Sequence, residues 1–309
     1  MTGQINRDTN GQEKSTASRV VDLAFEARSR HSLFPIAWSL GNILLAAAFF
    51  FALYAGIWEY STQRYLTGFS NAIVPATASD EDKIQAILSW MNFGPTRLPY
   101  NLASTNHDRD PTDTLNYDAL LSVCGTATNA FINLADTAHL RVRRLLLLDN
   151  SRVTKHVVAE VFVNTKWIIV DPAYRTILRD KNGHAVTRED LLDPEKFSDV
   201  TKGIKNYLPE YSFENTVHVR VGGLPVVGRP IGAILNRFFP GWEASTFVTL
   251  LVERESLAAE VTAILLLILL LLFRSTLRWY AEHRLNFSPV FLRDRARLAV
   301  SAFIRAPES

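Results

Sequence analysis

Two long segments with almost no charged residues stand out when apolar and polar positions are followed along the chain. The first, Leu33 to Trp58, contains 26 residues and no charge. The second has an apolar centre at 261–273 and extends to 257–280, with Glu260 and Arg274 towards its two ends. Because about 20 helical residues cross a hydrocarbon layer of about 30 Å, the pattern predicts transmembrane helices at 33–58 and 257–280.

The first segment has a rival interpretation as a cleaved secretory signal. Such a signal lies close to the N-terminus and ends at a cleavage site of small residues. Here some thirty polar residues precede the apolar run and no such site follows it. A buried helix of a soluble domain rarely stays uncharged over this length. We therefore expect a retained membrane anchor.

Basic residues beside the two segments indicate how they are oriented. Most lie on the outer flanks, at Arg28, Arg30, Arg274, Arg278 and Arg284. The positive-inside rule then places both termini in the cytoplasm. The predicted order is a cytoplasmic tail at 1–32, an extracytoplasmic or periplasmic domain at 59–256 and a basic cytoplasmic tail at 281–309. The sequence FLRDRARLAVSAFIRA in that last tail fits either a basic amphipathic helix on anionic lipid or a short soluble helix.

Between the two segments, the pattern is that of a domain with both helices and strands. Apolar residues at helical spacing run from Asp80 to just before Gly94, and again from Cys124 to Ala138. Shorter apolar runs at 144–148, 156–163 and 167–171 indicate strands, and the last two form a hairpin around a turn at 164–166. This order predicts an α+β fold in which a helix beginning at Cys124 packs on an antiparallel sheet.

The pattern is less regular beyond Tyr174. The segment DLLDPEKFSDV predicts a short helix, and NTVHVRV predicts another strand. Between that strand and the second apolar segment lies GGLPVVGRPIGAILNRFFPGW, which is rich in glycine, proline and apolar residues. This stretch fits an ordinary connecting loop, the interpretation that we favour, or else a lid or a membrane-proximal platform.

Composition removes several classes of protein. Among the 309 residues there is a single cysteine, which excludes a disulfide framework and a zinc site built from paired cysteines. A net charge of +2 argues against a nucleic-acid binder. With 21% charged and 11% aromatic residues, the chain is not disordered as a whole. The composition leaves a folded, membrane-anchored protein with one thiol.

The thiol stands first in a series of residues that suits nucleophilic catalysis. Cys124 precedes or begins a helix, His156 begins the first strand of the hairpin and Asp171 ends the second. Both hairpin ends lie on one rim of the sheet, where a thiol at a helix tip could meet a base and an orienting acid. A helix N-terminus and an imidazolium each lower a thiol pKa. Asn116 and Tyr117, shortly before the cysteine, are candidates for lining the cleft.

Each residue taken alone also has a simpler explanation. A lone cysteine is usually a small buried hydrophobe, His156 could be a polar residue at a strand edge, and Asp171 could end its strand before Pro172. The predicted location favours chemistry, because an unpaired thiol in an oxidising compartment is prone to oxidation. The histidines outside this series are given no catalytic role: His107, His139, His184 and His218.

Two segments containing these residues resemble a known family. CGTATNAFINLADTAHLRVR has Cys at the head of a helix that ends in an alanine, a short loop and an arginine. KHVVAEVFVNTKWIIVDPAY has His at the start of a strand, then a tryptophan and an Asp-Pro pair. Together with the helix ending near Trp90, they resemble the transglutaminase-like superfamily. This papain-like group includes bacterial transglutaminase-like cysteine proteinases and peptide N-glycanases. The resemblance covers roughly Asp80 to Tyr174, in a core of about 80–180.

The resemblance implies a papain-like fold and a role for each of the three residues. Cys124 would be the nucleophile, His156 the general base and acid, and Asp171 the residue that orients the imidazole. The chain departs from the family pattern at Ser122, where many members have glycine, and at Leu140, where glycine commonly precedes the arginine. Neither departure affects the three residues.

The function implied is that of a cysteine protease or amide hydrolase that works through a thioester, with no cofactor and no metal. Its expected partners are a peptide or protein amide substrate, the lipid bilayer and other membrane proteins of the cell envelope, but no nucleic acid. Two alternatives stay open. One is a true amine acyltransferase, and the other is a non-catalytic scaffold in exopolysaccharide or cell-wall assembly.

Overall fold

The computed structural model describes residues 33–94, 110–208, 210–220 and 228–285. The chain divides into two compact units. One, which we call the apolar unit, combines the residues up to Leu53 with those from Thr262 onward. The other, the sheet unit, runs from Tyr54 to Val261. The predictions for the two terminal tails at 1–32 and beyond 285 lie outside the described residues.

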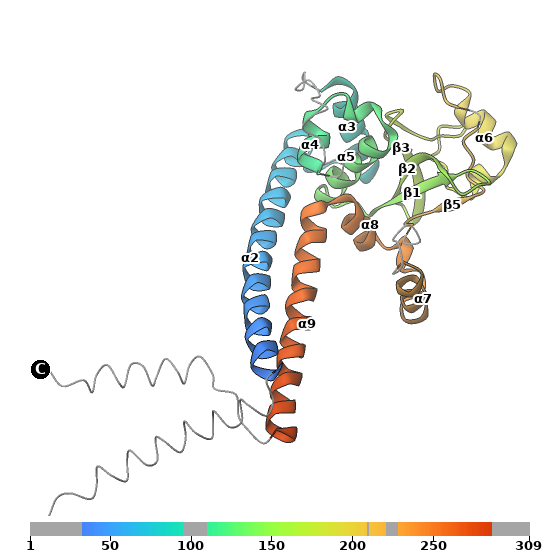
Figure 1. Cartoon of the computed structure of the whole chain (residues 1–309). Helices are drawn as coiled ribbons and strands as arrows, with labels where there is room; N and C mark the ends of the chain where they lie inside the picture. The colour runs from blue at the N-terminus through green and yellow to red at the C-terminus, as the bar shows by residue number, and fades with distance from the viewer. Residues whose placement is uncertain (1–32, 95–109, 209, 221–227, 286–309) are drawn as a thin grey trace, which may run out of the picture. The chain divides into compact units, whose positions relative to one another are not determined.

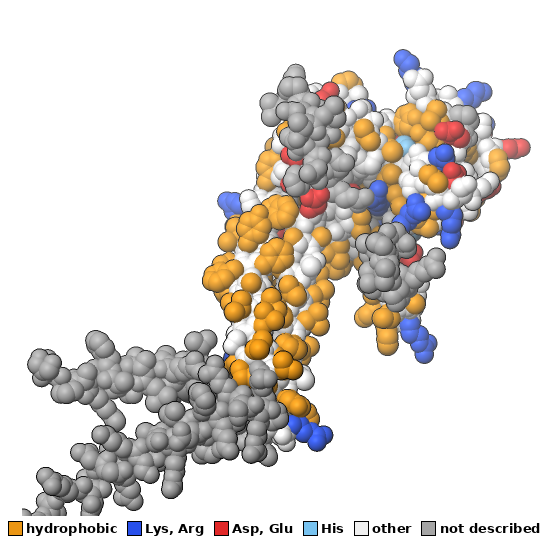
Figure 2. Space-filling model, in the orientation of Figure 1, with side chains coloured by type: hydrophobic (Ala, Val, Ile, Leu, Met, Phe, Trp, Pro, Cys, Tyr) orange, Lys and Arg blue, Asp and Glu red, His pale blue; other side chains and the backbone are white. Residues whose placement is uncertain are grey.

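The apolar unit is built from parts of two long helices, α2 (Leu33–Ile73) and α9 (Glu255–Arg284). By length and composition, these are the two helices among the described residues that could cross a membrane. The ring of Phe273 lies beside Gly41, and the guanidinium of Arg274 is 5.3 Å from the ring centroid of Trp38. Hydrophobic side chains cover much of the outer surface of the two helices (Figure 2).

The sheet unit contains one five-stranded antiparallel sheet, with strand order β4-β3-β2-β1-β5 (Figure 1). Its strands are β1 (Val142–Leu148), β2 (Thr154–Val163), β3 (Lys166–Asp171), β4 (Thr176–Ile177) and β5 (Thr216–Val217). The predicted α+β class is confirmed at this level, and so is the packing of the helix that begins at Cys124 on the sheet.

Shorter α-helices among the described residues accompany the sheet: α3 (Asp80–Phe93), α4 (Pro111–Asn116), α5 (Cys124–Thr137), α6 (Pro194–Thr201), α7 (Gly228–Phe238) and α8 (Thr246–Glu253). Short 3₁₀ turns lie at Leu120–Ser122, Asp190–Leu192 and Trp242–Ala244. Three helices begin after a side chain that accepts a backbone N–H, as helix caps do: Ser79 before α3, Asp110 before α4 and Asp193 before α6.

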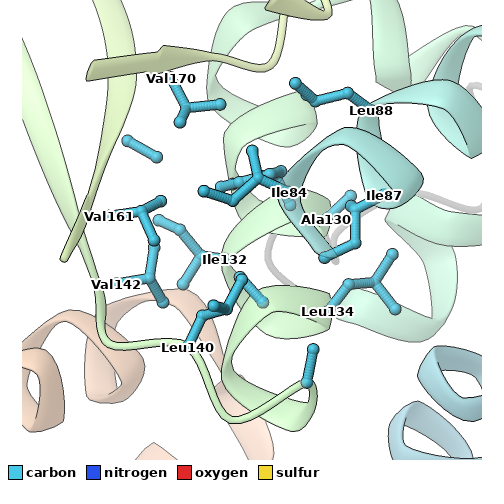
Figure 3. Packing of buried hydrophobic residues seen from close by; sticks show 14 of the residues in the cluster. Ile84, Ile87, Leu88, Ala130, Ile132, Leu134, Leu140, Val142, Val161 and Val170 are labelled. Carbon is cyan, nitrogen blue, oxygen red and sulfur yellow. The ribbon is translucent and has the colours of Figure 1, made fainter. Parts of the chain in front are cut away.

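One face of the sheet forms the larger hydrophobic core with α5 and α3 (Figure 3). Helix α5 contributes small and large apolar residues, and α3 contributes the stripe that its helical spacing predicts. The buried members from these two helices are Ile84, Ile87, Leu88, Met91, Ala127, Ala130, Phe131, Ile132, Leu134 and Ala135. Because α5 is held along its length by this core, its first residue has a fixed position at the rim of the sheet.

The opposite face of the sheet is covered by the chain that follows β4. Val158 and Ile169 point to this side, whereas their neighbours Ala159 and Val170 point to α5. This alternation is the period of two that a strand imposes. The covering residues are Leu178, Val186, Leu191, Val200 and Phe213. The central strands are therefore buried on both faces, which explains the nearly continuous apolar run of β2.

The boundaries differ from the sequence prediction at a few points. Strand β2 begins at Thr154, two residues before His156. The turn of the hairpin consists of Asn164 and Thr165, both left-handed with φ of 46° and 72°, so Lys166 already pairs with Val163. A two-residue turn of this hand fits the twist of the flanking strands. The predicted strand NTVHVRV is confined to Thr216–Val217 in the described residues.

The stretch for which we favour a connecting loop instead contains an 11-residue helix, α7. Its proline, Pro230, lies in the first turn, where a missing N–H does not disturb the hydrogen bonds of the helix. Apolar residues at helical spacing follow it, including Ile234 and Phe238. The interpretation as a connecting loop is therefore wrong for 228–238.

Candidate active site

Cys124 is the first residue of α5, and its side chain is partly buried at the rim of the sheet. The preceding Val123 is extended and provides no side-chain cap. Hydrogen bonding within α5 begins with the N–H of Ala127, which donates to the carbonyl of Val123 at 2.8 Å. The thiol therefore lies at the positive end of the helix dipole, as the sequence predicts.

His156 and Asp171 form a buried pair at one end of the hairpin. The distance from Nε2 of His156 to Oδ2 of Asp171 is 2.7 Å, and the two side chains are 1% and 0% exposed. The other carboxylate oxygen, Oδ1, accepts the N–H groups of Ala173 and Tyr174 at 3.1 and 3.3 Å. The carboxylate is thus fixed by three contacts and in turn fixes the ring orientation.

The register of the hairpin explains why these two side chains meet. Ala159 pairs with Val170, so Asp171 continues one residue beyond this pair and His156 lies three residues beyond it on β2. Both side chains therefore point to the same face of the sheet, in a diagonal relation that long side chains can span. The sequence alone predicts that both residues lie on one rim of the sheet. The register of the hairpin shows in addition that their side chains point to the same face.

The imidazole links the carboxylate to the thiol. Nε2 is engaged with Asp171, whereas Nδ1 is buried and makes no hydrogen bond of standard geometry among the described residues. The interaction with His156 is the main cause that lowers the pKa of the Cys124 thiol, against the opposing effect of burial. The N–H groups of Val157 and Gly125 lower it further.

The pKa of His156 moves in the opposite direction. Burial alone would lower it, but the interactions with Asp171 and Cys124 outweigh burial and raise the pKa to about 9. A lowered thiol pKa beside a raised imidazole pKa favours the thiolate–imidazolium pair at neutral pH. The structure therefore brings together all three residues that the sequence singles out, each from a different element.

Three tyrosines surround the imidazole. The ring of Tyr211 stacks on His156, with centroids 4.2 Å apart and planes 5° from parallel. Tyr174 and Tyr207 approach the imidazole edge-on, at 5.8 and 6.2 Å. Burial raises the pKa of all three phenols, so they are neutral at physiological pH. They enclose the histidine in an aromatic environment.

The tyrosines are held by contacts between two distant segments. The hydroxyl of Tyr174 donates to the carbonyl of Asn206 at 2.9 Å, and its ring lies 4.7 Å from that of Tyr207. Sequence reasoning missed Tyr207 and Tyr211. The available signal was the NYLPEY stretch, in which two aromatic residues are spaced by four, but nothing in it points to His156.

The loop after Asp171 is fixed by Arg175, a further residue that sequence reasoning missed. Arg175 has a left-handed backbone, with φ of 54°. Its guanidinium donates to the carbonyls of Met91 and Leu121, at 3.2 and 3.5 Å. These carbonyls belong to the end of α3 and to the turn before Cys124. Arg175 therefore ties the loop of the acid to the segment that leads into the nucleophile.

Buried polar side chains anchor α5 on the side away from the core. The guanidinium of Arg254 donates to Asn133 Oδ1 and Asp136 Oδ2, each at 2.8 Å, and to Glu59 Oε1 at 3.2 Å. Ser256 donates to the other oxygen of Glu59 at 2.7 Å. Arg254 is 3% exposed and lies at the break between α8 and α9. We refer to this group as the Arg254 clamp.

The neighbouring Glu253 makes a parallel set of contacts. Its backbone carbonyl accepts the side-chain amides of Asn129 and Asn133, at 2.6 and 3.0 Å. Its carboxylate accepts Nη1 of Arg144 on β1 at 2.5 Å. The helix that begins with Cys124 is therefore fixed both by its apolar face and by its polar face.

The remaining candidates lie elsewhere. Asn116 donates its side-chain amide to Thr112 of its own helix at 2.6 Å, which is no contact with the site. His218 contacts the buried Glu160 at 2.8 Å, and His184 contacts Asp180. His139 has a left-handed backbone at the end of α5. His107 lies outside the described residues.

Comparison with known proteins does not identify the chain. No family model matches the chain, and neither a curated protein nor a solved structure is significantly similar to it. A function can therefore be inferred only from the residues of this chain and from the resemblance of its motifs.

Proposed function

We propose that the protein is a membrane-anchored, extracytoplasmic cysteine hydrolase of the transglutaminase-like type, acting on amide bonds. Cys124 is the nucleophile, His156 the general acid and base, and Asp171 the orienting residue. The observation that carries the proposal is the buried pair of the Asp171 carboxylate and Nε2 of His156, 2.7 Å apart, beside a Cys124 thiol whose pKa the imidazole lowers. The order of these three residues along the chain is that of the superfamily it resembles.

The reaction follows from the state of these groups. The thiolate of Cys124 attacks the carbonyl carbon, a sulfur–carbon bond forms and the carbonyl oxygen becomes an oxyanion. When this intermediate collapses, the carbon–nitrogen bond breaks and the imidazolium of His156 gives its proton to the leaving amine. His156 then removes a proton from water, which attacks the thioester. The acid leaves, and the thiolate and imidazolium are restored.

The start of α5 supplies the means to stabilise the oxyanion. The N–H groups of Cys124, Gly125 and Thr126 precede the first hydrogen bond within the helix, which Ala127 donates. Backbone donors at a helix N-terminus are suited to a developing negative charge, and such donors account for much of the rate of acyl-transfer enzymes. Asp171 contributes by keeping the imidazole in one orientation while it shuttles the proton.

The membrane part of the proposal follows from α2 and α9. Both helices are long and apolar enough to cross a bilayer, and the basic residues flanking them favour cytoplasmic termini. The sheet unit would then lie on the outer face of the cytoplasmic membrane. In that position the natural substrate is a peptide or protein amide of the cell envelope, and other envelope membrane proteins are natural partners.

The test uses the purified full-length protein in lipid nanodiscs with dimethylcasein and dansylcadaverine. Release of peptides indicates hydrolysis, and incorporation of the fluorescent amine indicates acyl transfer to an amine. We expect peptide release that is lost in Cys124→Ala and in His156→Gln. If incorporation of the amine dominates over release of peptides, the proposed activity changes from hydrolysis to acyl transfer. Equal signals from wild type and Cys124→Ala would exclude both catalytic functions on this substrate.

One observation favours a second function, that of a non-catalytic scaffold. Tyr211 stacks on the imidazole, and the two other tyrosines approach its edge, so the histidine is covered in this structure. A scaffold would need no reactive thiol. Labelling with chloroacetamide distinguishes the two functions, because a scaffold predicts that Cys124 reacts no faster than an ordinary cysteine.

A further inference from the structure

Helix α7 exposes a set of large apolar side chains. Ile234, Phe238 and Phe239 are 58%, 70% and 65% exposed. The nearby Phe247, at the start of α8, is 52% exposed. Figure 2 shows hydrophobic side chains gathered over α7, next to basic ones. We call these four residues the α7 patch. Clustered apolar side chains of this size mark an interaction site more often than isolated ones do.

The helical geometry separates this patch from a polar face. At 100° per residue, Ile234 and Phe238 lie 40° apart on the helix, whereas the exposed Ala233 lies 140° from Phe238. The sequence of α7 contains Arg229 and Arg237 but no acidic residue. An apolar stripe beside basic residues is the pattern of helices that lie in the interface of a membrane with anionic headgroups.

The end of the helix is held rigidly in this arrangement. The N–H of Phe239 donates to Leu235 at 2.7 Å, and the N–H of Trp242 donates to Phe239 at 3.1 Å. The indole of Trp242 donates to Oδ1 of Asn236 at 2.8 Å. Gly241 makes this reversal with φ of 81°. The aromatic residues Phe239 and Trp242 at the end of α7 therefore have a defined conformation. Aromatic residues are enriched at membrane interfaces.

The chain also limits how far the patch can lie from the bilayer. Only 22 residues separate Phe238 from Val261, where the apolar centre of α9 begins. Of these, 8 form α8 and 6 form the start of α9. Helical residues rise 1.5 Å each and extended ones at most about 3.5 Å, so this connection spans at most about 50 Å.

We propose that α7 is a third membrane contact, an amphipathic helix that lies in the plane of the outer interface with Ile234 and Phe238 towards the acyl chains. This inference rests on the membrane anchoring proposed above. Its consequence is an additional contact with the bilayer that constrains the orientation of the sheet unit on the membrane. The bound partner is the lipid surface itself.

The experiment uses the full chain with Cys124→Ser, so that an introduced cysteine is the only one. Three variants carry a fluorescent label, at Phe238→Cys, Ala233→Cys and Leu265→Cys. They are reconstituted into vesicles of phosphatidylethanolamine and phosphatidylglycerol that contain nitroxide-labelled lipid. Ala233 is the matched control on the other face of α7, and the exposed Leu265 is the control for the span.

We expect the lipid nitroxide to quench the label at position 238 about three-fold more than the label at position 233. Strong quenching at 265 with none at 238 would overturn the proposal for α7 and leave the anchoring intact. No quenching at 265 would overturn both. A label at 238 that is shielded from lipid and water quenchers alike, or that crosslinks to a second copy, would assign the patch to a protein partner and overturn the lipid contact.

Discussion

At the scale of single residues, the proposed function depends on two coupled ionisations. His156 and Cys124 shift each other's pKa in opposite directions, and Asp171 adds to the shift of the histidine. Each unit of pKa corresponds to a ten-fold change in the ratio of the two protonation states. The reactivity of the thiol near neutral pH is therefore a direct measure of its contact with the imidazole.

The first prediction concerns that reactivity. Because Cys124 is the only cysteine, the rate of alkylation by chloroacetamide reports on it alone. At pH 6, replacing His156 by Gln removes the partner that stabilises the thiolate, and we expect the rate to fall about ten-fold or more. Mass spectrometry of the labelled full-length protein measures the rate. A His156→Gln protein that reacts as fast as wild type would contradict the thiolate–imidazolium pair.

A second prediction concerns Tyr211 and the fall of activity at high pH, which we call the alkaline limb of the pH profile. In the proposed mechanism the imidazolium protonates the leaving amine, so we expect activity to fall as pH rises through the His156 pKa of about 9. Burial opposes this raised pKa, and Tyr211 covers one face of the ring. Tyr211→Ala uncovers the ring, weakens the effect of burial and shifts the alkaline limb to higher pH.

The control for Tyr211 is its replacement by Phe, which keeps the stacked ring. The alkaline limb of Tyr211→Phe should coincide with that of wild type, measured as dimethylcasein hydrolysis from pH 6 to 10.5. If Ala and Phe move the limb equally, the effect belongs to the hydroxyl and not to the stack. If the alkaline limb of Tyr211→Ala moves to lower pH, the ring of Tyr211 does not desolvate His156.

At the scale of helices and strands, the site depends on how α5 is held. Its apolar face packs on the sheet, and its polar face contacts the Arg254 clamp. Helices normally leave their polar face to water. A buried guanidinium that donates to Asn133, Asp136 and Glu59, and to Gln63 as a fourth partner, is therefore a strong constraint. A buried charge that loses its partner costs about 3–5 kcal/mol, whereas an exposed ion pair contributes about 0–1 kcal/mol.

The third prediction follows from this difference. Arg254→Met leaves the buried carboxylate of Glu59 and the partly exposed carboxylate of Asp136 without the guanidinium, and we expect it to lower the free energy of unfolding by about 3 kcal/mol. The matched control is Lys196→Met, which removes the exposed 3.2 Å pair with Asp190 and should cost less than about 1 kcal/mol. Denaturant unfolding of the full chain in detergent, followed by tryptophan fluorescence, measures both. Equal losses would mean that the clamp is no stronger than a surface pair.

Local features of this architecture could be predicted from the sequence, whereas its long-range contacts could not. The helix at 80–93, the start of α5 at Cys124 and the end of β3 at Asp171 follow from spacing, charged first turns and proline, all of which act within a few residues. The Arg254 clamp joins residues more than 110 positions apart. Its arginine stands in the run ERE, which reads as a solvated charge cluster in the sequence.

The tyrosines around His156 illustrate the same limit. Tyr207 and Tyr211 reach the histidine only because the chain after β4 returns to cover the second face of the sheet. Nothing in the sequence of β2 indicates which segment of the chain covers that second face. Helix α7 was missed for another reason, since glycine and proline around an apolar stretch are equally typical of loops.

At the scale of the whole molecule, apolar residues are unevenly distributed along the chain, and the proposed location of the thiol depends on this distribution. The average over the chain is unremarkable, with a mean hydropathy of +0.04, because two apolar helices are combined with a domain of ordinary composition. The argument for a functional thiol uses this distribution directly. An unpaired cysteine is expected to be inert in a reducing compartment, but it is a liability in an oxidising one.

The last prediction therefore concerns topology. In a Cys124→Ser background, Ser151→Cys lies in the exposed turn between β1 and β2, and His283→Cys lies in the last turn of α9. In spheroplasts of an expressing bacterium, a membrane-impermeant maleimide should label position 151 from outside, and position 283 only after permeabilisation. The basic residues beyond the second span are the physical reason, since they resist translocation. The reverse pattern would put the sheet unit in the cytoplasm, where a free thiol needs no special explanation, and the case for Cys124 would then depend on its contact with His156 alone.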